Sequence, residues 1–179
     1  YMIAHAVQQD DSRHIRTLAE LNAVTYGDNM IADLNAGINI TDTLEQILIS
    51  TDGRIDKFDI IADRMMADYV RSIQVAPGGI VTDIYPAEGN EAGKIDLIHD
   101  KYRGETVKYS IANDALIIHG PFELEQGGHV LSIRNPVFLQ DEKGTPYFWG
   151  MTMVIIKVPD IFQHSADVLS DSRGTVQPQ

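Results

Sequence analysis

Cysteine is absent from this chain of 179 residues, tryptophan occurs once, and acidic residues outnumber basic ones. Without cysteine the chain has no disulfide framework, no thiolate zinc site and no cysteine nucleophile. The 26 Asp and Glu against 14 Lys and Arg give a net charge of −12. This charge is spread along the chain, which argues against nucleic acid as a partner and against a polybasic membrane patch.

Long hydrophobic runs are also missing. The longest apolar stretch, Gly150–Ile156, falls far short of the ~20 residues that span a bilayer, and no signal peptide is visible. The chain as given is therefore expected to be soluble. Its start at Tyr1, without an initiator methionine, suggests a piece excised from a longer protein.

The first 70 residues carry helical patterns. Apolar residues recur at three- and four-residue steps over 15–24 and again over 31–38, with Gly27 between the two runs. This fits one long helix kinked at Gly27, which we favour, or two helices joined by a turn there. A further helix is predicted to begin at Thr41, whose hydroxyl suits a cap, and another to span 58–69.

Strand patterns begin near Ser72. Alternating or β-rich segments predict five strands, bounded by turn residues, over 72–75, 80–85, 116–119, 129–139 and 147–158. A helix capped by Asp100 is predicted over 101–113, and a short final helix over 161–168.

This order of elements predicts an α+β fold. A long N-terminal helical segment precedes a single PAS-like five-stranded antiparallel sheet with flanking helices. The expected boundaries are 1–70 for the helical stalk and lead-in helices, 71–168 for the ligand-binding core, and 169–179 for a flexible polar tail.

Signatures of common enzymes are absent: the sequence has no G-x-S-x-G elbow, no phosphate-binding loop and no H-E-x-x-H motif. The six histidines are scattered, so neither a metal site nor a cofactor is expected. Four acids, Asp83, Glu88, Glu91 and Asp96, crowd one segment. They leave open a small hydrolase or lyase. A protein-interaction domain without a small-molecule pocket is the other alternative.

Several short motifs follow one another in the second half of the chain. They are Y-P-x-x-G-N-E at 85–91, D-L at 96–97, G-P-x-x-L-x-Q-G-G at 120–128, R-x-P-V-F at 134–138 and F-W-G at 148–150. Over about residues 72–162 this succession closely resembles the CHASE family, the extracytoplasmic sensory domains of membrane-bound histidine kinases, diguanylate cyclases and adenylyl cyclases. One departure is that Gly93 lies three residues before Asp96, where the family usually has glycine two residues before.

The resemblance implies a non-catalytic sensor on the extracytoplasmic side of the membrane. It would belong to a bacterial transmembrane receptor of histidine kinase or diguanylate cyclase type, whose transmembrane helices and cytoplasmic output domain lie elsewhere in the protein. By analogy with the cytokinin receptors, Asp96 would bind the ligand and Ile118 would offer a backbone contact. A homodimer through the N-terminal helix would couple small-molecule binding to helix movement across the membrane.

Pocket chemistry gives a second basis for naming site residues, because a ligand pocket combines apolar walls with a few polar groups. The predicted walls are Tyr85, Leu97, Phe122, Ile133 and Trp149, and the predicted polar groups are Asp96, Thr82, His119, Ser132 and Arg134. Asp96 could instead cap a helix or pair with Arg134, and Trp149 could serve packing alone.

Overall fold

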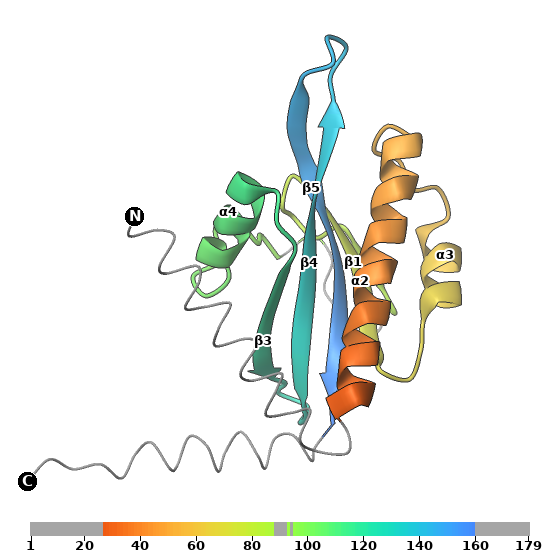
Figure 1. Ribbon diagram of the computed structural model, residues 1–179, viewed down its shortest axis with the longest axis vertical. Coiled ribbons are helices and arrows are strands. Elements are labelled where there is room, and N and C mark those ends of the chain that lie inside the picture. The colour runs from red at the N-terminus through yellow and green to blue at the C-terminus, as the bar shows by residue number, and fades with distance from the viewer. Residues whose placement is uncertain (1–26, 88–92, 94, 160–179) are drawn as a thin grey trace, which may run out of the picture.

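A five-stranded antiparallel sheet organises the molecule (Figure 1). In the computed structural model, which describes residues 27–87, 93 and 95–159, the spatial strand order is β2-β1-β5-β4-β3. The strands are β1 (Val70–Pro77), β2 (Asp83–Tyr85), β3 (Ile117–Glu123), β4 (His129–Gln140) and β5 (Pro146–Val158). The predicted α+β class is confirmed, and β1 and β2 form the hairpin that the sequence indicated. The segment before Gly27 and the predicted final helix and tail lie outside the described residues.

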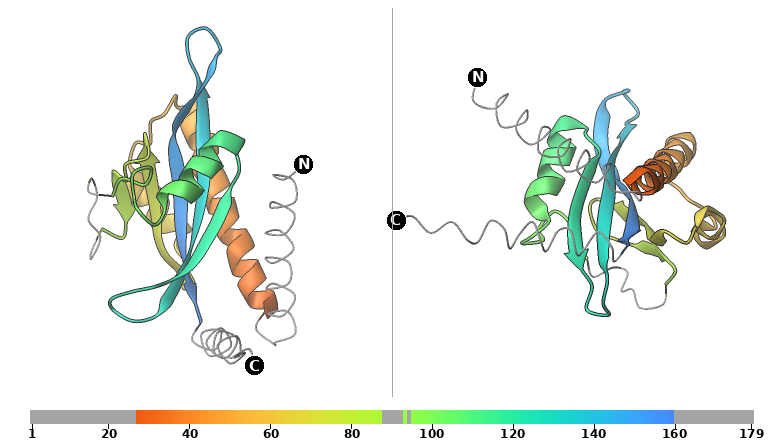
Figure 2. Two further views of the ribbon diagram at one scale, coloured as in Figure 1. Left: turned by 90° about the vertical axis from the view of Figure 1, so that its left-hand side faces the viewer. Right: turned by 60° about the horizontal axis from the view of Figure 1, so that its bottom comes forward.

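One face of the sheet is covered by two helices, α2 (Gly27–Ser50) and α3 (Phe58–Met65), as the right-hand view of Figure 2 shows. Their apolar side chains join those of β1, β4 and β5 in one buried cluster. At Gly37, a side chain would bring its Cβ within 2.6 Å of the Ile133 side chain. This glycine therefore lets α2 approach the sheet closely.

The predicted helix start at Thr41 is wrong, because α2 runs through this position without a break. The Thr41 hydroxyl donates a hydrogen bond to the Ile38 carbonyl of its own helix at 2.7 Å instead of capping a new one. The Thr41 carbonyl accepts a hydrogen bond from Thr152 of β5 at 3.0 Å. Packing on the sheet thus keeps a β-branched residue inside the helix. The next helix also ends earlier than predicted, at Met65.

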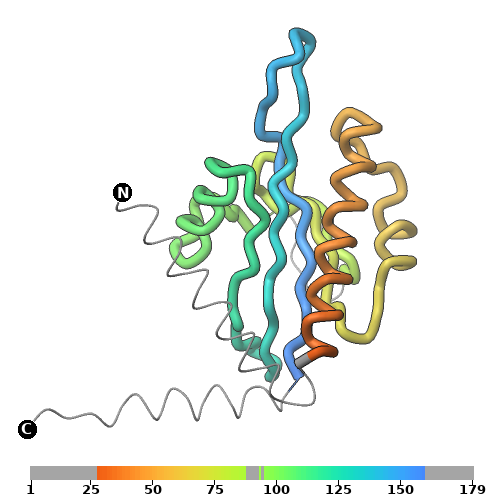
Figure 3. The backbone as a smooth tube through the Cα atoms, viewed as in Figure 1, coloured from red at the N-terminus to blue at the C-terminus, as the bar shows by residue number. Residues whose placement is uncertain are grey.

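The opposite face is covered by the segment 95–103 and by α4 (Gly104–Asn113). The helix predicted over 101–113 begins at Gly104, since 101–103 form a turn. Asp100 still caps this region: its carboxylate accepts hydrogen bonds from the amides of Tyr102 and Arg103, each at 2.8 Å. Figure 3 shows that this segment and the α2–α3 pair lie on opposite sides of the central strands.

Among the described residues, no helix is both long enough and apolar enough to cross a membrane.

Candidate ligand-binding site

A hollow of about 290 Å³ lies on the α4 face of the sheet. Its floor follows from the strand register, because residues opposite each other on neighbouring strands point to the same face. One cross-strand row contains Ser72, Ile155 and Ser132, and the next contains Gln74, Met153 and Arg134. All six residues line the hollow.

The walls come from the segments that cross this face. The remaining lining residues are Ile95, Leu97 and Arg103 on the α4 side, Val130 and Arg71 on the strands, and Phe122 to Gln126 at the β3–β4 turn. Arg71 of β1 reaches this turn and donates a hydrogen bond to the Gln126 side chain at 3.0 Å. The β3–β4 turn is thereby linked across the hollow to β1.

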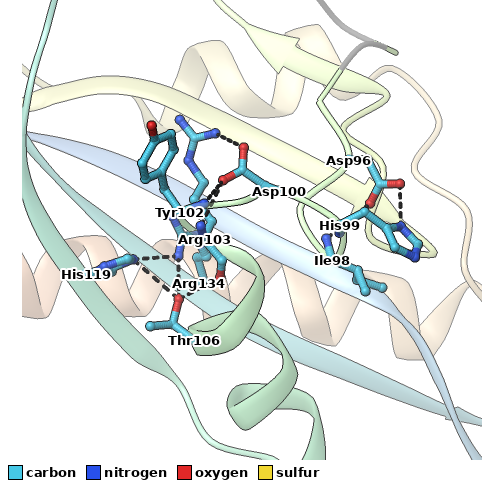
Figure 4. A network of polar contacts seen from close by, with 9 residues as sticks. All are labelled: Asp96, Ile98, His99, Asp100, Tyr102, Arg103, Thr106, His119 and Arg134. Carbon is cyan, nitrogen blue, oxygen red and sulfur yellow. Dashed lines mark hydrogen bonds and ion pairs between the residues drawn. The ribbon is translucent and has the colours of Figure 1, made fainter.

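Arg134 is the most deeply buried charged residue of this floor, with 2% of its surface exposed. Its Nη1 donates to the Nδ1 atom of His119 at 3.1 Å and to the Thr106 hydroxyl at 3.3 Å (Figure 4). Within the described part of the chain, its Nε is buried without any hydrogen-bond partner, and the guanidinium forms no ion pair. Burial of a charge without an opposite charge is unfavourable, so this residue is not explained by packing alone.

Burial and neighbouring positive charge act together on the titration of Arg134 and His119. Burial, followed by the charge of Arg103, lowers the pKa of Arg134 to about 10, with Asp100 acting in the opposite direction. Burial also lowers the pKa of His119, assisted by the charges of Arg134 and Arg103. His119 is therefore neutral at pH 7, and its unprotonated Nδ1 can accept the hydrogen bond from Arg134.

The nearest carboxylate is already occupied. Asp100 pairs with the guanidinium of Arg103 at 3.0 Å, and Figure 4 shows this pair turned away from the Nη1 of Arg134. Although burial alone would raise the pKa of Asp100, hydrogen bonds from the amides of Arg103 and Tyr102 and the Arg103 charge hold it below its ordinary value. Asp100 is thus an ionised partner of Arg103, and no described carboxylate pairs with Arg134.

Ser132 precedes Arg134 by two positions on β4 and lies on the same face. Its side chain is buried, and within the described residues its hydroxyl has no hydrogen-bond partner. In β1, by contrast, the side chain of Gln74 donates to the Ser72 hydroxyl at 3.0 Å. Two unpartnered donors, the Ser132 hydroxyl and the Arg134 Nε, therefore occupy adjacent inward positions of one strand.

The structure brings four of the predicted site residues together in the hollow: Leu97, Phe122, Ser132 and Arg134. His119 does not line the hollow but supports it, since its ring contacts the Arg134 guanidinium and packs in a T-shaped arrangement against the ring of Phe122.

The other predicted side chains lie elsewhere. Tyr85 donates a hydrogen bond to Asp63 of α3, and Ile133 packs in the cluster beneath α2 together with Trp149. Ile118, which was predicted to offer a backbone contact, is not among the residues that line the hollow. Thr82 is exposed and bonds to its neighbour Asp83 at 2.9 Å.

Asp96 is placed outside the hollow as well. Its carboxylate accepts hydrogen bonds from the amides of Ile98 and His99 and contacts the His99 ring at 2.7 Å. The contacts with His99 lower its pKa, and 42% of the side chain is exposed. Asp96 therefore has the capping geometry that the sequence allowed as an alternative, and it does not pair with Arg134.

The sequence patterns did not indicate that β1 and the arginines Arg71 and Arg103 contribute to the hollow. One local signal was available: Ser72 and Gln74 are polar residues at alternate positions of a strand, and both are buried. Buried polar side chains at period two mark a face that needs partners. Among the described residues, no cluster of three metal-binding side chains exists.

Fold and site together define an α+β domain with a polar-floored hollow on one face of its sheet. No known family model matches the chain, and no curated protein matches it. It is similar in fold to a solved structure described as an extracellular ligand binding receptor from Desulfohalobium retbaense DSM5692, with a TM-score of 0.58 and 16% sequence identity. The match covers 82% of this chain and 25% of that one, so this chain spans about a quarter of its neighbour's length.

Proposed function

We propose that this chain is the extracytoplasmic ligand-binding sensor domain of a transmembrane signalling receptor. The hollow carries this proposal, because its floor combines apolar side chains with buried polar groups that have no partner among residues 27–87, 93 and 95–159. The motifs similar to the CHASE family support the same function, as does the fold shared with an extracellular ligand binding receptor. The receptor type would be a histidine kinase or a diguanylate cyclase, and catalysis would belong to its output domain.

The strands offer a direct route from ligand to helix. On β4, Ser132 and Arg134 face the hollow, whereas the intervening Ile133 packs against α2 at Gly37. On β5, Ile155 faces the hollow and Ile156 packs against the same glycine. A ligand that shifts these strands would therefore change how α2 packs on the sheet. If the ligand binds one packing arrangement more tightly than the other, it would shift the population of receptor states toward that arrangement.

Helix α2 would pass this shift to the preceding segment and to a second copy of the chain. A homodimer through the N-terminal helix is part of the proposal, because a symmetric pair of helices can serve as a two-state element.

Thermal unfolding of the 179-residue chain tests the function. The chain would be screened against purines, amino acids, short peptides and organic acids. A compound at 100 times its Kd stabilises the folded state by about 2.7 kcal/mol. For a chain of this size, that corresponds to a rise in Tm of roughly 5–10 °C.

Two matched variants locate the binding. Ser132→Leu places apolar volume on the floor of the hollow and is expected to abolish the rise in Tm. Ser50→Leu makes the same change at an exposed position at the end of α2 and is expected to preserve it. If no class of compound raises the Tm, or if Ser132→Leu still responds, the proposed function is refuted.

A further inference from the structure

The guanidinium of Arg134 has a used edge and an unused one. A guanidinium carries five N–H donors in a rigid plane. Both hydrogen bonds that it makes within the described residues leave from Nη1, toward His119 and Thr106. The opposite edge, which includes Nε, has no described partner. This edge presents parallel N–H donors, the arrangement that binds a carboxylate through two hydrogen bonds.

We propose that the ligand of this hollow is a small organic carboxylate, bound by the free edge of Arg134 and by the hydroxyl of Ser132. The inference rests on the proposed function and narrows its ligand to one chemical class. It accounts for two donors on adjacent inward positions of β4 that have no partner among the described residues, and for a buried positive charge that has no counter-ion among them. Both features raise the free energy of the folded state unless a bound anion supplies the hydrogen-bond acceptors and the opposite charge.

The charge balance favours a single carboxylate over a phosphate. Arg103 is already paired with Asp100, and His119 is neutral, so among the described residues the floor carries one uncompensated positive charge, that of Arg134. One carboxylate neutralises it. At the walls, the single charge of Arg71 faces two glutamates of the β3–β4 turn, Glu123 and Glu125. A phosphate dianion would leave a second buried negative charge unpaired, and Glu123 and Glu125 in the β3–β4 turn repel a dianion more strongly than a single carboxylate.

The size of the hollow limits the rest of the ligand. A volume of about 290 Å³ is at the lower end of the range for ligand pockets and equals that of about ten water molecules in the liquid. This suits a molecule of metabolite size. Its apolar part would contact Leu97, Phe122 and Met153, which line the hollow beside the polar groups.

Binding must also move a side chain. Neither the Arg134 Nε nor the Ser132 hydroxyl is exposed to solvent, so a ligand oxygen reaches them only when a covering group shifts. Arg103 is suited to this movement because it lines the hollow, is 40% exposed and is held by the turn at Asp100. Carboxylate binding is thereby coupled to a displacement at the start of α4, as a sensor requires.

The test compares acids with their neutral counterparts. Propionate, succinate, benzoate and L-glutamate would be titrated into the 179-residue chain beside propionamide, succinamide, benzamide and L-glutamine, with inorganic phosphate and sulfate as separate arms. Calorimetry gives the Kd, and thermal unfolding gives the Tm. At least one of the carboxylates is expected to bind, and its amide counterpart is expected not to bind. L-Glutamine is the exception among the amides, because it keeps its α-carboxylate.

Four variants assign the binding to named atoms. Arg134→Met keeps the length of the side chain and is expected to weaken carboxylate binding at least thirtyfold, which reflects the cost of truncating one partner of a buried charge pair. Arg134→Lys retains the charge but loses the planar edge, so an intermediate loss is expected. Ser132→Ala is expected to weaken binding about tenfold. Arg64→Met removes an exposed arginine of α3 and is expected to leave the Kd unchanged.

Stability separates a ligand role from a structural role. Removal of a buried, unpaired charge relieves its desolvation cost, so an apolar residue of similar volume can take its place without loss of stability. Arg134→Met is therefore expected to unfold at the same Tm as the parent chain, or higher, in the absence of added acid. If Arg134 is instead needed for the fold, Arg134→Met would lower the Tm. In that case Ser132→Ala still reports on binding in a folded chain.

The possible failures differ in meaning. If a neutral or cationic compound binds in the hollow with the same Kd in Arg134→Met, the carboxylate inference falls and the proposed sensor function stands. Binding of phosphate or sulfate, but of no carboxylate, also overturns the inference. If no compound of any class binds, both the carboxylate inference and the proposed sensor function are refuted.

Discussion

The hydrogen bond between Asn135 and Glu45 joins the strand that carries Arg134 to helix α2. The Asn135 amide donates to the Glu45 carboxylate at 2.8 Å, across 90 residues of sequence. Asn135 is buried and Glu45 half-buried. Removal of the amide by Asn135→Ala leaves the carboxylate without this donor, although water can reach it in part. The expected cost is about 1.5 kcal/mol, the lower end of the range for hydrogen bonds to charged groups.

For a chain of this size, a loss of 1.5 kcal/mol lowers the Tm by roughly 3–6 °C. Urea unfolding of the parent chain, Asn135→Ala, Glu45→Ala and the double variant would give the coupling free energy of the pair. Glu45→Gln serves as the control, because its carbonyl can still accept the hydrogen bond, and it should lose less stability than Glu45→Ala. A coupling energy below about 0.3 kcal/mol would refute the view that this contact holds α2 on β4.

Three other outcomes follow from the same structure. Gly150→Ala would place a Cβ 2.4 Å from the Ala76 carbonyl oxygen of the neighbouring strand, so urea unfolding should show a loss of about 1–3 kcal/mol; an unchanged free energy of unfolding would contradict the close strand approach. The pKa of His119 is lowered in the folded state, so the unfolded chain binds more protons and stability should fall as the pH drops through the ordinary histidine pKa of about 6.5. His119→Gln should flatten this dependence in unfolding curves measured from pH 7.5 to 5, and an identical slope would exclude His119 as its source. Asp96→Asn should leave ligand affinity unchanged, because Asp96 lies outside the hollow, whereas loss of affinity in calorimetry would place the ligand at the 95–99 segment instead.

Much of the architecture could be read from local patterns. Strand alternation and turn residues identified all five strands, because the two-residue repeat of a strand and the conformations of glycine and proline are properties of short segments. The same patterns indicated Ser132 and Arg134 as polar residues within an apolar strand. Such residues are conspicuous without coordinates, since burial of a charge or hydroxyl in a sheet calls for a partner.

Local patterns were less reliable where contacts between residues far apart in the sequence determine the helix boundaries. Thr41 carries a helix-start signal, yet it lies inside α2, because the helix packs along β5 and its carbonyl accepts a bond from Thr152. The cap at Asp96 shows the opposite case: its hydrogen bonds are to residues two and three positions away, and no long-range packing is needed for them.

The amino-acid order alone determined the α+β class, the five strands and the presence of Ser132 and Arg134 within an apolar strand, since each depends on residues near one another in the chain. Only the tertiary structure decided that Ser72 and Gln74 share a floor with Ser132 and Arg134, and that Tyr85, Trp149 and Asp96 do not. The reason is strand register, which aligns residues about 60 positions apart. A shift of one residue would turn every side chain of a strand to the opposite face.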